Sequence, residues 1–284
     1  MLYGNVNKNG AFIEGLTCNA VNDFPIDIIR NASSNSAQAL SLCMRFQHAL
    51  SEHFPLILSA GRRSLKVQEN HALHHSSSYF GGQSSSQATS ESACFGMGLL
   101  LSSLMRLKIV THCARVILLP ADESLAYGRF LLGIPIMAHG GMPRVLLNSQ
   151  CLLMSHRPKD SLDRHQAEIQ FNDILTQYDD YKKDPVNNAL DALRQNETIR
   201  DMSDLSIAMN IPAKILNQQL TGLGSSFFQV MEYHQRSRLV DALTAGNDDY
   251  QDVAGRLHLN STRQLGATCR RLFHRTPESI RYRA

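Results

Sequence analysis

The chain has 284 residues, a hydrophobic fraction of 43% and a formal net charge of +3, so it can form two domains with buried cores. This composition excludes a disordered chain, and so small a net charge does not by itself indicate nucleic acid. The N-terminus lacks a signal-peptide pattern, and the longest apolar stretch, Leu99 to Val110, is interrupted by serine and basic residues and is too short to span a bilayer. We therefore expect a soluble cytoplasmic protein without a membrane segment.

The first part of the chain has the pattern of a mixed α/β domain. Ser36 to Leu50 carries apolar residues at helical spacing after a serine-rich start, and Met97 to Lys108 is an apolar run expected to form a buried helix. Short buried strands are predicted at Leu56–Leu58, Arg115–Leu119 and Val145–Leu147.

Two polar segments are predicted to lie outside the cores. His74 to Ser92 is of low complexity and is expected to form an exposed loop. His71, His74 and His75 could bind a metal, but no carboxylate or cysteine stands beside them at ligand spacing, so no metal site is predicted. Tyr178 to Pro185 is charged and ends in proline, which predicts a linker between an α/β domain at 1–183 and an all-α domain at 184–284.

The sequence contains no pattern typical of a catalytic or cofactor site. Gly96-Met97-Gly98 and Gly222-Leu223-Gly224 do not continue to a GxGxxG motif after a strand and are interpreted as turns or packing sites. No serine is framed as a nucleophile elbow. The cysteines form no CxxC pair, and most have apolar neighbours, which favours buried free thiols in a reducing compartment. We expect no enzyme and no cofactor.

An internal repeat is the most informative feature of the chain. Asp201-Met202-Ser203-Asp204-Leu205-Ser206 and Asp249-Tyr250-Gln251-Asp252-Val253-Ala254 share an aspartate at a helix N-cap position and an acid three residues later. A turn residue, Asn210 or His258, follows four residues after the small Ser206 or Ala254. Asparagine tolerates the left-handed conformation that such turns need better than histidine does.

A second amphipathic helix is predicted after each turn. Its apolar face is Ile215, Leu216 and Leu220 in the first copy and Leu265, Cys269 and Leu272 in the second. Two helices joined by a tight turn form a helix-turn-helix, whose second helix can enter a DNA major groove. Two copies about fifty residues apart are far more specific than one.

The segment between the copies is predicted to be a long helix. Its apolar stripe contains Phe227, Met231, His234, Leu239 and Ala242/Leu243, with Arg236 and Arg238 outside the stripe. A stiff connector would hold two reading helices about 34 Å apart, the spacing of successive major grooves. The chain then ends in an arginine-rich region after Val253, which is either a phosphate-binding face or a solvated helix surface.

These segments resemble the AraC/XylS family of transcription regulators. The resemblance covers Val186 to Arg281 and is carried by Gly224-Ser225-Ser226-Phe227, the connecting helix, Val253-Ala254, and Thr276-Pro277-Glu278-Ser279-Ile280-Arg281. It implies two helix-turn-helix motifs that bind double-stranded promoter DNA, and a protein that works with RNA polymerase, more often as an activator.

The resemblance also implies which side chains contact DNA. The first recognition helix would present Lys214, Asn217 and Gln218 to base edges, chemistry that suits adenine and guanine. The second would present Thr262, Arg263, Gly266 and Ala267, of which Arg263 is the strong base reader, while Arg270 and Arg271 would contact phosphates. Gln264 and Arg236 complete the candidate set. For each of these residues the alternative is a solvated polar side chain.

The second copy departs further from the family pattern than the first. His258 and His274 stand where glycine is usual, Ala267 replaces an arginine and Cys269 an aromatic residue. In the first copy, Pro212 replaces the usual small N-cap residue. We therefore expect sequence specificity mainly from the first helix and backbone affinity from the second.

Val116 to Leu153 resembles the arabinose-binding-like N-terminal domain of one AraC-type branch. The matching residues are Val116 to Pro120, Tyr127 to Ile136 and Leu146 to Leu153. We expect the domain to be shortened at its start, because Leu2-Tyr3-Gly4 resembles a segment normally well inside it. The resemblance implies control by a small-molecule effector or by homodimerisation, without identifying the ligand.

Two other classes of function remain open at this point. The chain could be a protein that no longer reads DNA and antagonises a related regulator by pairing with it, as the changes at His258, Ala267 and His274 would allow. An enzyme with an appended DNA-binding tail is disfavoured, because no catalytic pattern is present.

Overall fold

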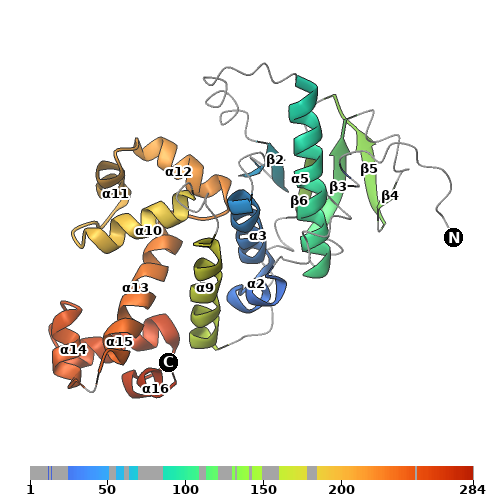
Figure 1. Cartoon of the computed structure of the whole chain (residues 1–284). Helices are drawn as coiled ribbons and strands as arrows, with labels where there is room; N and C mark the ends of the chain where they lie inside the picture. Colours follow the sequence, from blue (N-terminus) through green and yellow to red (C-terminus); the bar gives the residue numbers. More distant parts are fainter. Residues whose placement is uncertain are drawn as a thin grey trace.

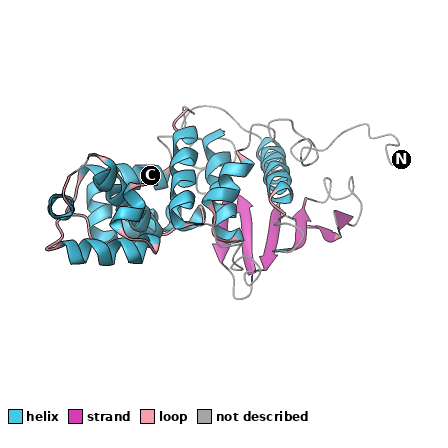
Figure 2. Ribbon diagram, turned by 90° about the horizontal axis from the view of Figure 1, so that it is seen from below, coloured by secondary structure: helices cyan, strands magenta, loops and turns pink. Residues whose placement is uncertain are grey.

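The computed structural model describes residues 12, 14, 25–50, 56–60, 64–69, 86–108, 113–120, 130–131, 133–140, 143–148, 160–177, 184–246 and 248–283. The strands lie at one end of the molecule, and the helices that follow residue 184 lie at the other (Figures 1 and 2). The expectation of a mixed α/β part followed by a helical part agrees with this order of elements.

A six-stranded sheet forms the N-terminal part. Its strands are β1 (Leu56–Ala60), β2 (Ser64–Glu69), β3 (Ala114–Leu119), β4 (Phe130–Leu131), β5 (Ile134–Ala138) and β6 (Arg144–Asn148). They are ordered β1-β2-β6-β3-β5-β4, and all neighbours are antiparallel except β3 and β5. Val145 and Leu147 of β6 are buried while their neighbours are partly exposed, because successive side chains of a strand point to opposite faces. The three predicted strands lie within β1, β3 and β6.

Three of the described helices complete the buried core of the N-terminal part. They are α2 (Ile26–Ala32), α3 (Ser36–Leu50) and α5 (Ser86–Arg106). Leu100, Leu101 and Leu104 of α5 share one buried cluster with Ile117 of β3 and Val145 of β6. Helix α3 has the predicted bounds, and Asn35 caps its start by accepting a hydrogen bond from the Gln38 amide at 2.9 Å.

The predicted loop at His74–Ser92 is wrong over its last part, because α5 begins at Ser86. The helix expected from Met97 therefore starts more than two turns earlier and ends at Arg106 instead of Lys108. The rest of the predicted loop, with His71, His74 and His75, lies outside the described residues. Cys43, Cys94, Cys113 and Cys269 are buried, as expected, while Cys18 and Cys151 lie outside the described part.

Helix α9 (Ser161–Leu175) lies between the N-terminal core and the C-terminal helices (Figure 1). Phe171 and Leu175 belong to the core that contains the sheet, whereas Leu162, at the other end of the helix, belongs to a core formed by the C-terminal helices. Asp160 caps α9 by accepting a hydrogen bond from the Leu162 amide at 3.0 Å. One helix therefore contributes to both parts of the molecule.

The C-terminal part consists of seven helices within the described residues. They are α10 (Pro185–Gln195), α11 (Met202–Met209), α12 (Ala213–Gly222), α13 (Phe227–Thr244), α14 (Tyr250–Arg256), α15 (Thr262–Phe273) and α16 (Pro277–Arg281). The first cluster of buried residues joins α10, α11, α12 and the start of α13. A second joins the end of α13 to α14, α15 and α16. Helix α13 thus connects two small cores.

The predicted linker Tyr178–Pro185 lies mostly outside the described residues, but its end is not a solvated connection. The Asp184 side chain is buried and accepts a hydrogen bond from the Val186 amide at 2.9 Å, which caps α10. Pro185 is the first residue of this helix, where a missing amide hydrogen is tolerated. Asp184 and Pro185 therefore form the start of α10 and are not part of a solvated linker.

Candidate nucleic-acid interface

The first helix pair, α11 and α12, is closed by the turn that the sequence predicts. The Asp201 side chain accepts a hydrogen bond from the Asp204 amide at 2.9 Å, and Asp204 in turn accepts one from the Arg200 amide at 2.8 Å. These bonds satisfy amides that the first helical turn leaves free. Asn210 follows α11 in the left-handed conformation, with φ of 53°. The predicted roles of Asp201 and Asn210 are confirmed.

Helix α12 has one buried side and one exposed polar side. Leu216 and Leu220 are completely buried, whereas Lys214, Asn217 and Gln218 are exposed. Positions 214, 217 and 218 are three and four residues apart, so they lie on one helix face. Ile215 was assigned to the apolar side by its residue type, but its side chain is 43% exposed. Within the described residues, the Lys214, Asn217 and Gln218 side chains make no hydrogen bond or ion pair, and they are available for an external partner.

The second helix pair, α14 and α15, repeats this arrangement with different capping. His258 adopts the left-handed conformation at φ of 55° after α14. Ser261 caps α15 by accepting a hydrogen bond from the Gln264 amide at 3.3 Å. The Gln264 side chain accepts a hydrogen bond from the Asn260 amide at 2.7 Å, so it supports the start of the helix. Because its side-chain oxygen is occupied by this hydrogen bond, Gln264 is less available for the predicted contact with DNA.

Not every exposed polar side chain of α15 is free to contact an external partner. Leu265, Cys269 and Leu272 are buried, as predicted, and burial raises the pKa of the Cys269 thiol to about 11. Thr262, Arg263 and Arg270 are exposed and have no side-chain partner within the described residues. Arg271 donates a hydrogen bond to the Gln235 side chain of α13 at 3.1 Å. Only part of the predicted basic face is therefore free.

The remaining arginines of the C-terminal end hold the fold together. Arg256 pairs with Asp248 at 2.6 Å. Arg281 lies over the Tyr250 ring and donates hydrogen bonds to the Leu243 and Asp248 carbonyls at 3.0 and 2.8 Å. Arg275 and Arg283 both pair with Asp160, at the start of α9. The arginine-rich region thus contains two groups of arginines. One group is exposed without a partner among the described residues, and the other makes contacts within the protein.

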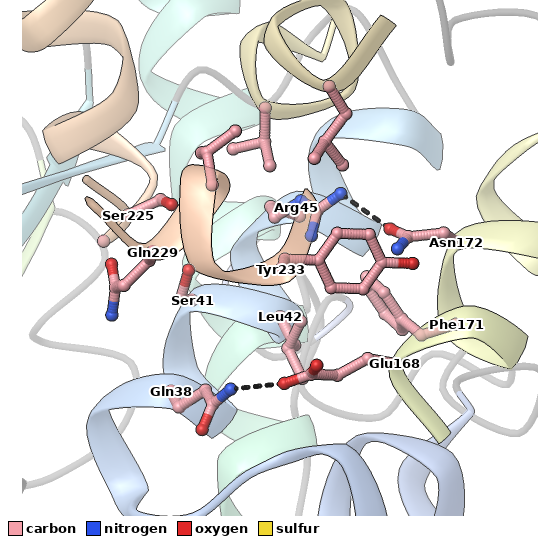
Figure 3. A pocket seen from close by; sticks show the side chains of 14 residues that line it. Gln38, Ser41, Leu42, Arg45, Glu168, Phe171, Asn172, Ser225, Gln229 and Tyr233 are labelled. Carbon is pink, nitrogen blue, oxygen red and sulfur yellow. Dashed lines mark hydrogen bonds between the residues drawn. The ribbon is translucent and has the colours of Figure 1, made fainter. Parts of the chain in front are cut away.

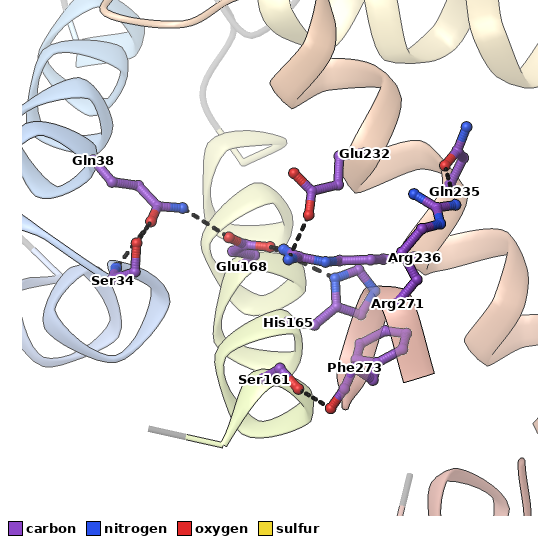
Figure 4. A network of polar contacts seen from close by, with 10 residues as sticks. All are labelled: Ser34, Gln38, Ser161, His165, Glu168, Glu232, Gln235, Arg236, Arg271 and Phe273. Atoms are coloured by element: carbon purple, nitrogen blue, oxygen red, sulfur yellow. Dashed lines mark hydrogen bonds and ion pairs between the residues drawn. The ribbon is translucent and has the colours of Figure 1, made fainter. Parts of the chain in front are cut away.

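The two arginines of α13 have internal partners that the sequence did not predict. The Arg236 side chain is 15% exposed, pairs with Glu232 at 2.8 Å and lies 3.9 Å from Glu168 of α9 (Figure 4). It faces the N-terminal part instead of the outer side of the helix, so its predicted DNA contact disagrees with its position. Arg238 pairs with Glu197 at 2.9 Å, which lies between α10 and α11.

Glu197 connects the two helix pairs. Besides Arg238, it contacts the His258 imidazole at 3.0 Å. The His258 hydrogen bond, followed by the Arg238 charge, holds the pKa of the Glu197 carboxyl below its ordinary value. Nearby, burial lowers the pKa of His234 of α13, and the Arg238 charge acts in the same direction. The turn of the second pair is therefore tied to the loop that precedes the first.

No protein-family model matches the chain, and no curated protein matches it. Among solved structures, the chain is similar to the transcriptional regulator CdpR from Pseudomonas aeruginosa, with 13% sequence identity and a TM-score of 0.40 over 97% of this chain and 88% of that chain. Membership of the AraC/XylS family therefore stays a prediction. None of the described helices is long and apolar enough to cross a membrane.

Buried polar contacts fasten the first helix pair to the N-terminal part. The Arg45 guanidinium of α3 pairs with Asp184 at 3.0 Å and donates to the Asn172 and Asn187 side chains at 3.0 and 2.9 Å. Ser41 donates to the Leu223 carbonyl at 2.6 Å, just after α12. This network was not predicted from the sequence. The only local signal for it was Asp184 before a proline, a common start of a helix.

Helix α9 fastens the second helix pair in the same way. Ser161 donates a hydrogen bond to the Phe273 carbonyl at the end of α15 (Figure 4). The His165 ring is buried between the rings of Tyr233 and Phe273, at centroid distances of 5.3 and 5.6 Å. The N-terminal part therefore contacts both helix pairs through separate elements, α3 and α9.

Proposed function

We propose that the chain is a sequence-specific DNA-binding transcription regulator of the AraC/XylS type, in which both helix pairs are helix-turn-helix motifs. The observation that carries this proposal is the exposed polar face of α12, repeated in reduced form on α15. Lys214, Asn217 and Gln218 project from α12 and have no partner among the described residues, and Arg263 occupies the start of α15. Asparagine and glutamine can bind adenine in the major groove, and arginine and lysine can bind guanine.

The length of α13 supports the placement of both recognition helices on one DNA face. Its 18 residues span about 27 Å at about 1.5 Å per residue. Successive major grooves on one DNA face lie about 34 Å apart. This spacing exceeds the length of α13, and the helix pairs packed at its two ends add the remaining distance. The Glu197 contacts to Arg238 and His258 restrict rotation between the pairs. A rigid arrangement reduces the entropy lost when both motifs bind.

The N-terminal part acts as the regulatory domain in this proposal. It contacts α13 and both helix pairs, so an effector or a second copy that binds it can change their relative position. The regulator binds promoter DNA in the cytoplasm and acts there with RNA polymerase as an activator. A metal or cofactor has no role in this scheme.

DNA binding by the purified full chain tests this proposal. Fluorescence anisotropy with fragments upstream of its own and neighbouring genes should find a preferred site and a steep loss of affinity with added salt. Replacing Lys214, Asn217 and Gln218 together by alanine should abolish the preference for that site. The control replaces Arg194 and Gln195, which are also exposed but lie on α10.

The same measurement separates the alternative function. A protein that antagonises a regulator by pairing with it should bind DNA weakly, with neither site preference nor a steep salt dependence. Arg271 and Gln264 favour this alternative to a limited extent, because their internal contacts leave Arg263 as the main base reader of α15. If all upstream fragments bind with equal affinity, the regulator proposal is rejected.

A further inference from the structure

A polar cavity lies where the N-terminal part meets α13. Its volume is about 230 Å³, large compared with the about 10–15 Å³ that one water needs. It is bordered by the start of α3, by Arg164 of α9 and by the side of α13 that carries Glu232 and Arg236. Figure 4 shows this junction, where Ser34 and Gln38 of the N-terminal part lie opposite Glu232 and Arg236.

The charges at the cavity wall do not cancel. Arg236 is paired with Glu232 at 2.8 Å, and its other carboxylate neighbour, Glu168, also accepts a hydrogen bond from Gln38 at 2.9 Å. Arg164 has no ion pair with any described residue, and its buried Nε has no hydrogen-bond partner there. Burial, followed by the nearby Arg236 charge, lowers the pKa of Arg164, whereas the Glu168 and Glu232 carboxylates act in the opposite direction. Arg164, Arg236 and Glu232 line the cavity, so the lining residues carry one positive charge in excess, and the Glu168 carboxylate lies outside the lining, 3.9 Å from Arg236.

The other polar groups of the wall are suited to hydroxyl oxygens. The Asn35 side-chain oxygen accepts from the Gln38 amide, which leaves its NH₂ group for a ligand. Gln229 also lines the cavity, and its side-chain oxygen accepts from the Ser226 hydroxyl at 3.1 Å. The start of α3 adds the partial positive charge of a helix N-terminus.

We propose that this cavity binds a small hydroxylated monocarboxylate, whose carboxylate pairs with the Arg164 guanidinium. A planar guanidinium can donate two parallel hydrogen bonds to a carboxylate, here through its terminal nitrogens. The single excess charge matches a monoanion, and Glu232 at the wall disfavours the dianionic form of phosphate. The Asn35 and Gln229 amides bind the hydroxyl groups.

The position of the cavity connects binding with DNA recognition. The ligand would contact α3 and α9 on one side and α13 on the other. A smaller cavity of about 90 Å³ shares Gln38, Gly224 and Gln229 with this one and extends toward Arg45 and Asn172 (Figure 3). Since α13 connects the two helix pairs, ligand binding would change their preferred spacing and hence DNA affinity. This regulatory part rests on the proposed function, whereas the binding site does not.

Isothermal titration calorimetry of the full chain without DNA tests the site. Sodium gluconate is the probe, with glucose as its neutral counterpart and with sodium phosphate at equal ionic strength. We expect saturable 1:1 binding of gluconate alone. Absence of saturable gluconate binding, or binding of glucose or phosphate with equal affinity, would overturn the assignment.

Three variants locate the binding. Arg164→Gln should weaken gluconate binding at least tenfold, whereas Arg194→Gln, an exposed arginine of α10, should leave it unchanged. Ala37→Leu adds volume at the cavity wall without removing charge and should also prevent binding, which keeps the test valid if Arg164→Gln does not fold. Binding that survives Ala37→Leu in a folded protein contradicts the proposed position.

DNA binding is then measured separately with and without gluconate. A change in affinity supports the regulatory role. If gluconate binds but no DNA site is found, the proposed function fails while the cavity assignment stands. If DNA binds specifically and gluconate does not, the reverse holds.

Discussion

The two helix pairs have the same order of elements but differ in how their polar side chains are used. On α12, Lys214, Asn217 and Gln218 have no internal partner within the described residues. On α15, Gln264 caps its own helix and Arg271 contacts α13. An exposed arginine is therefore a weaker indication of DNA contact than an exposed side chain without an internal partner. This difference supports an unequal division of base reading.

The largest expected effect is a loss of stability when the contact that anchors the first helix pair is removed. Arg45→Ala leaves Asp184 buried without its cation and should lower the free energy of unfolding by about 3–5 kcal/mol. Arg275→Ala, which removes a more exposed pair with Asp160, should lower it by about 1 kcal/mol. Urea denaturation followed by circular dichroism measures both. Equal losses would mean that the second pair is anchored as firmly as the first.

The division of base reading predicts different effects on specificity. Asn217→Ala should remove about 1–3 kcal/mol of discrimination at one base pair of the preferred site. Arg263→Ala should weaken binding without changing the preferred sequence. Selection of binding sites from a random DNA library, performed with both variants and the parent, measures the change. A large change of preferred sequence with Arg263→Ala would reject the division.

The left-handed histidines give a smaller effect. His274, with φ of 54°, follows α15 and has no side-chain partner within the described residues, so His274→Gly should raise stability by about 0.5–1 kcal/mol. At His258 the same change also removes the contact with Glu197, so the gain should be close to zero. Parallel urea denaturations of the two variants test this. An equal gain at both positions would show that the Glu197 contact contributes nothing.

The smallest expected effect is a pH dependence at the joint between the pairs. Burial and Arg238, with a smaller contribution from Arg194, lower the pKa of His234, and Glu197 opposes them. The unfolded chain therefore takes up a proton more readily, and stability falls as the pH drops below about 6.5. His234→Gln should lose less stability than the parent between pH 7.5 and 5.5. His274→Gln, at an exposed position, serves as the control and should behave like the parent.

Local patterns predicted local structure well. The Asp201 cap and the Asn210 turn depend on residues within one or two helical turns, and the sequence contains all of that information. The same holds for Leu216 and Leu220, which follow the helical period. Ile215 was misplaced because residue type outweighed its position on the helix.

Long-range contacts could not be predicted in this way. Arg236 lies against Glu168 of α9, and Arg238 pairs with Glu197, 41 residues away, and the residues near them in the sequence do not indicate these two partners. The start of α5 at Ser86 was missed because serine-rich composition favours loops, whereas its continuation into a buried helix overrides that preference. The positions of the candidate site were thus predicted, but the hydrogen bonds and ion pairs that some of its residues make within the protein were not.

Helix α9 also affects the order in which the molecule can form during synthesis. Leu162 and Ser161 leave the ribosome about a hundred residues before Phe273, their partner in the second core. Contacts between residues so far apart in the sequence form slowly, because a long loop must first be closed. Helices α15 and α16 therefore complete a core to which α9 contributes from a much earlier part of the chain. We expect a nascent chain that stops before α15 to keep this end of α9 accessible to chaperones and proteases.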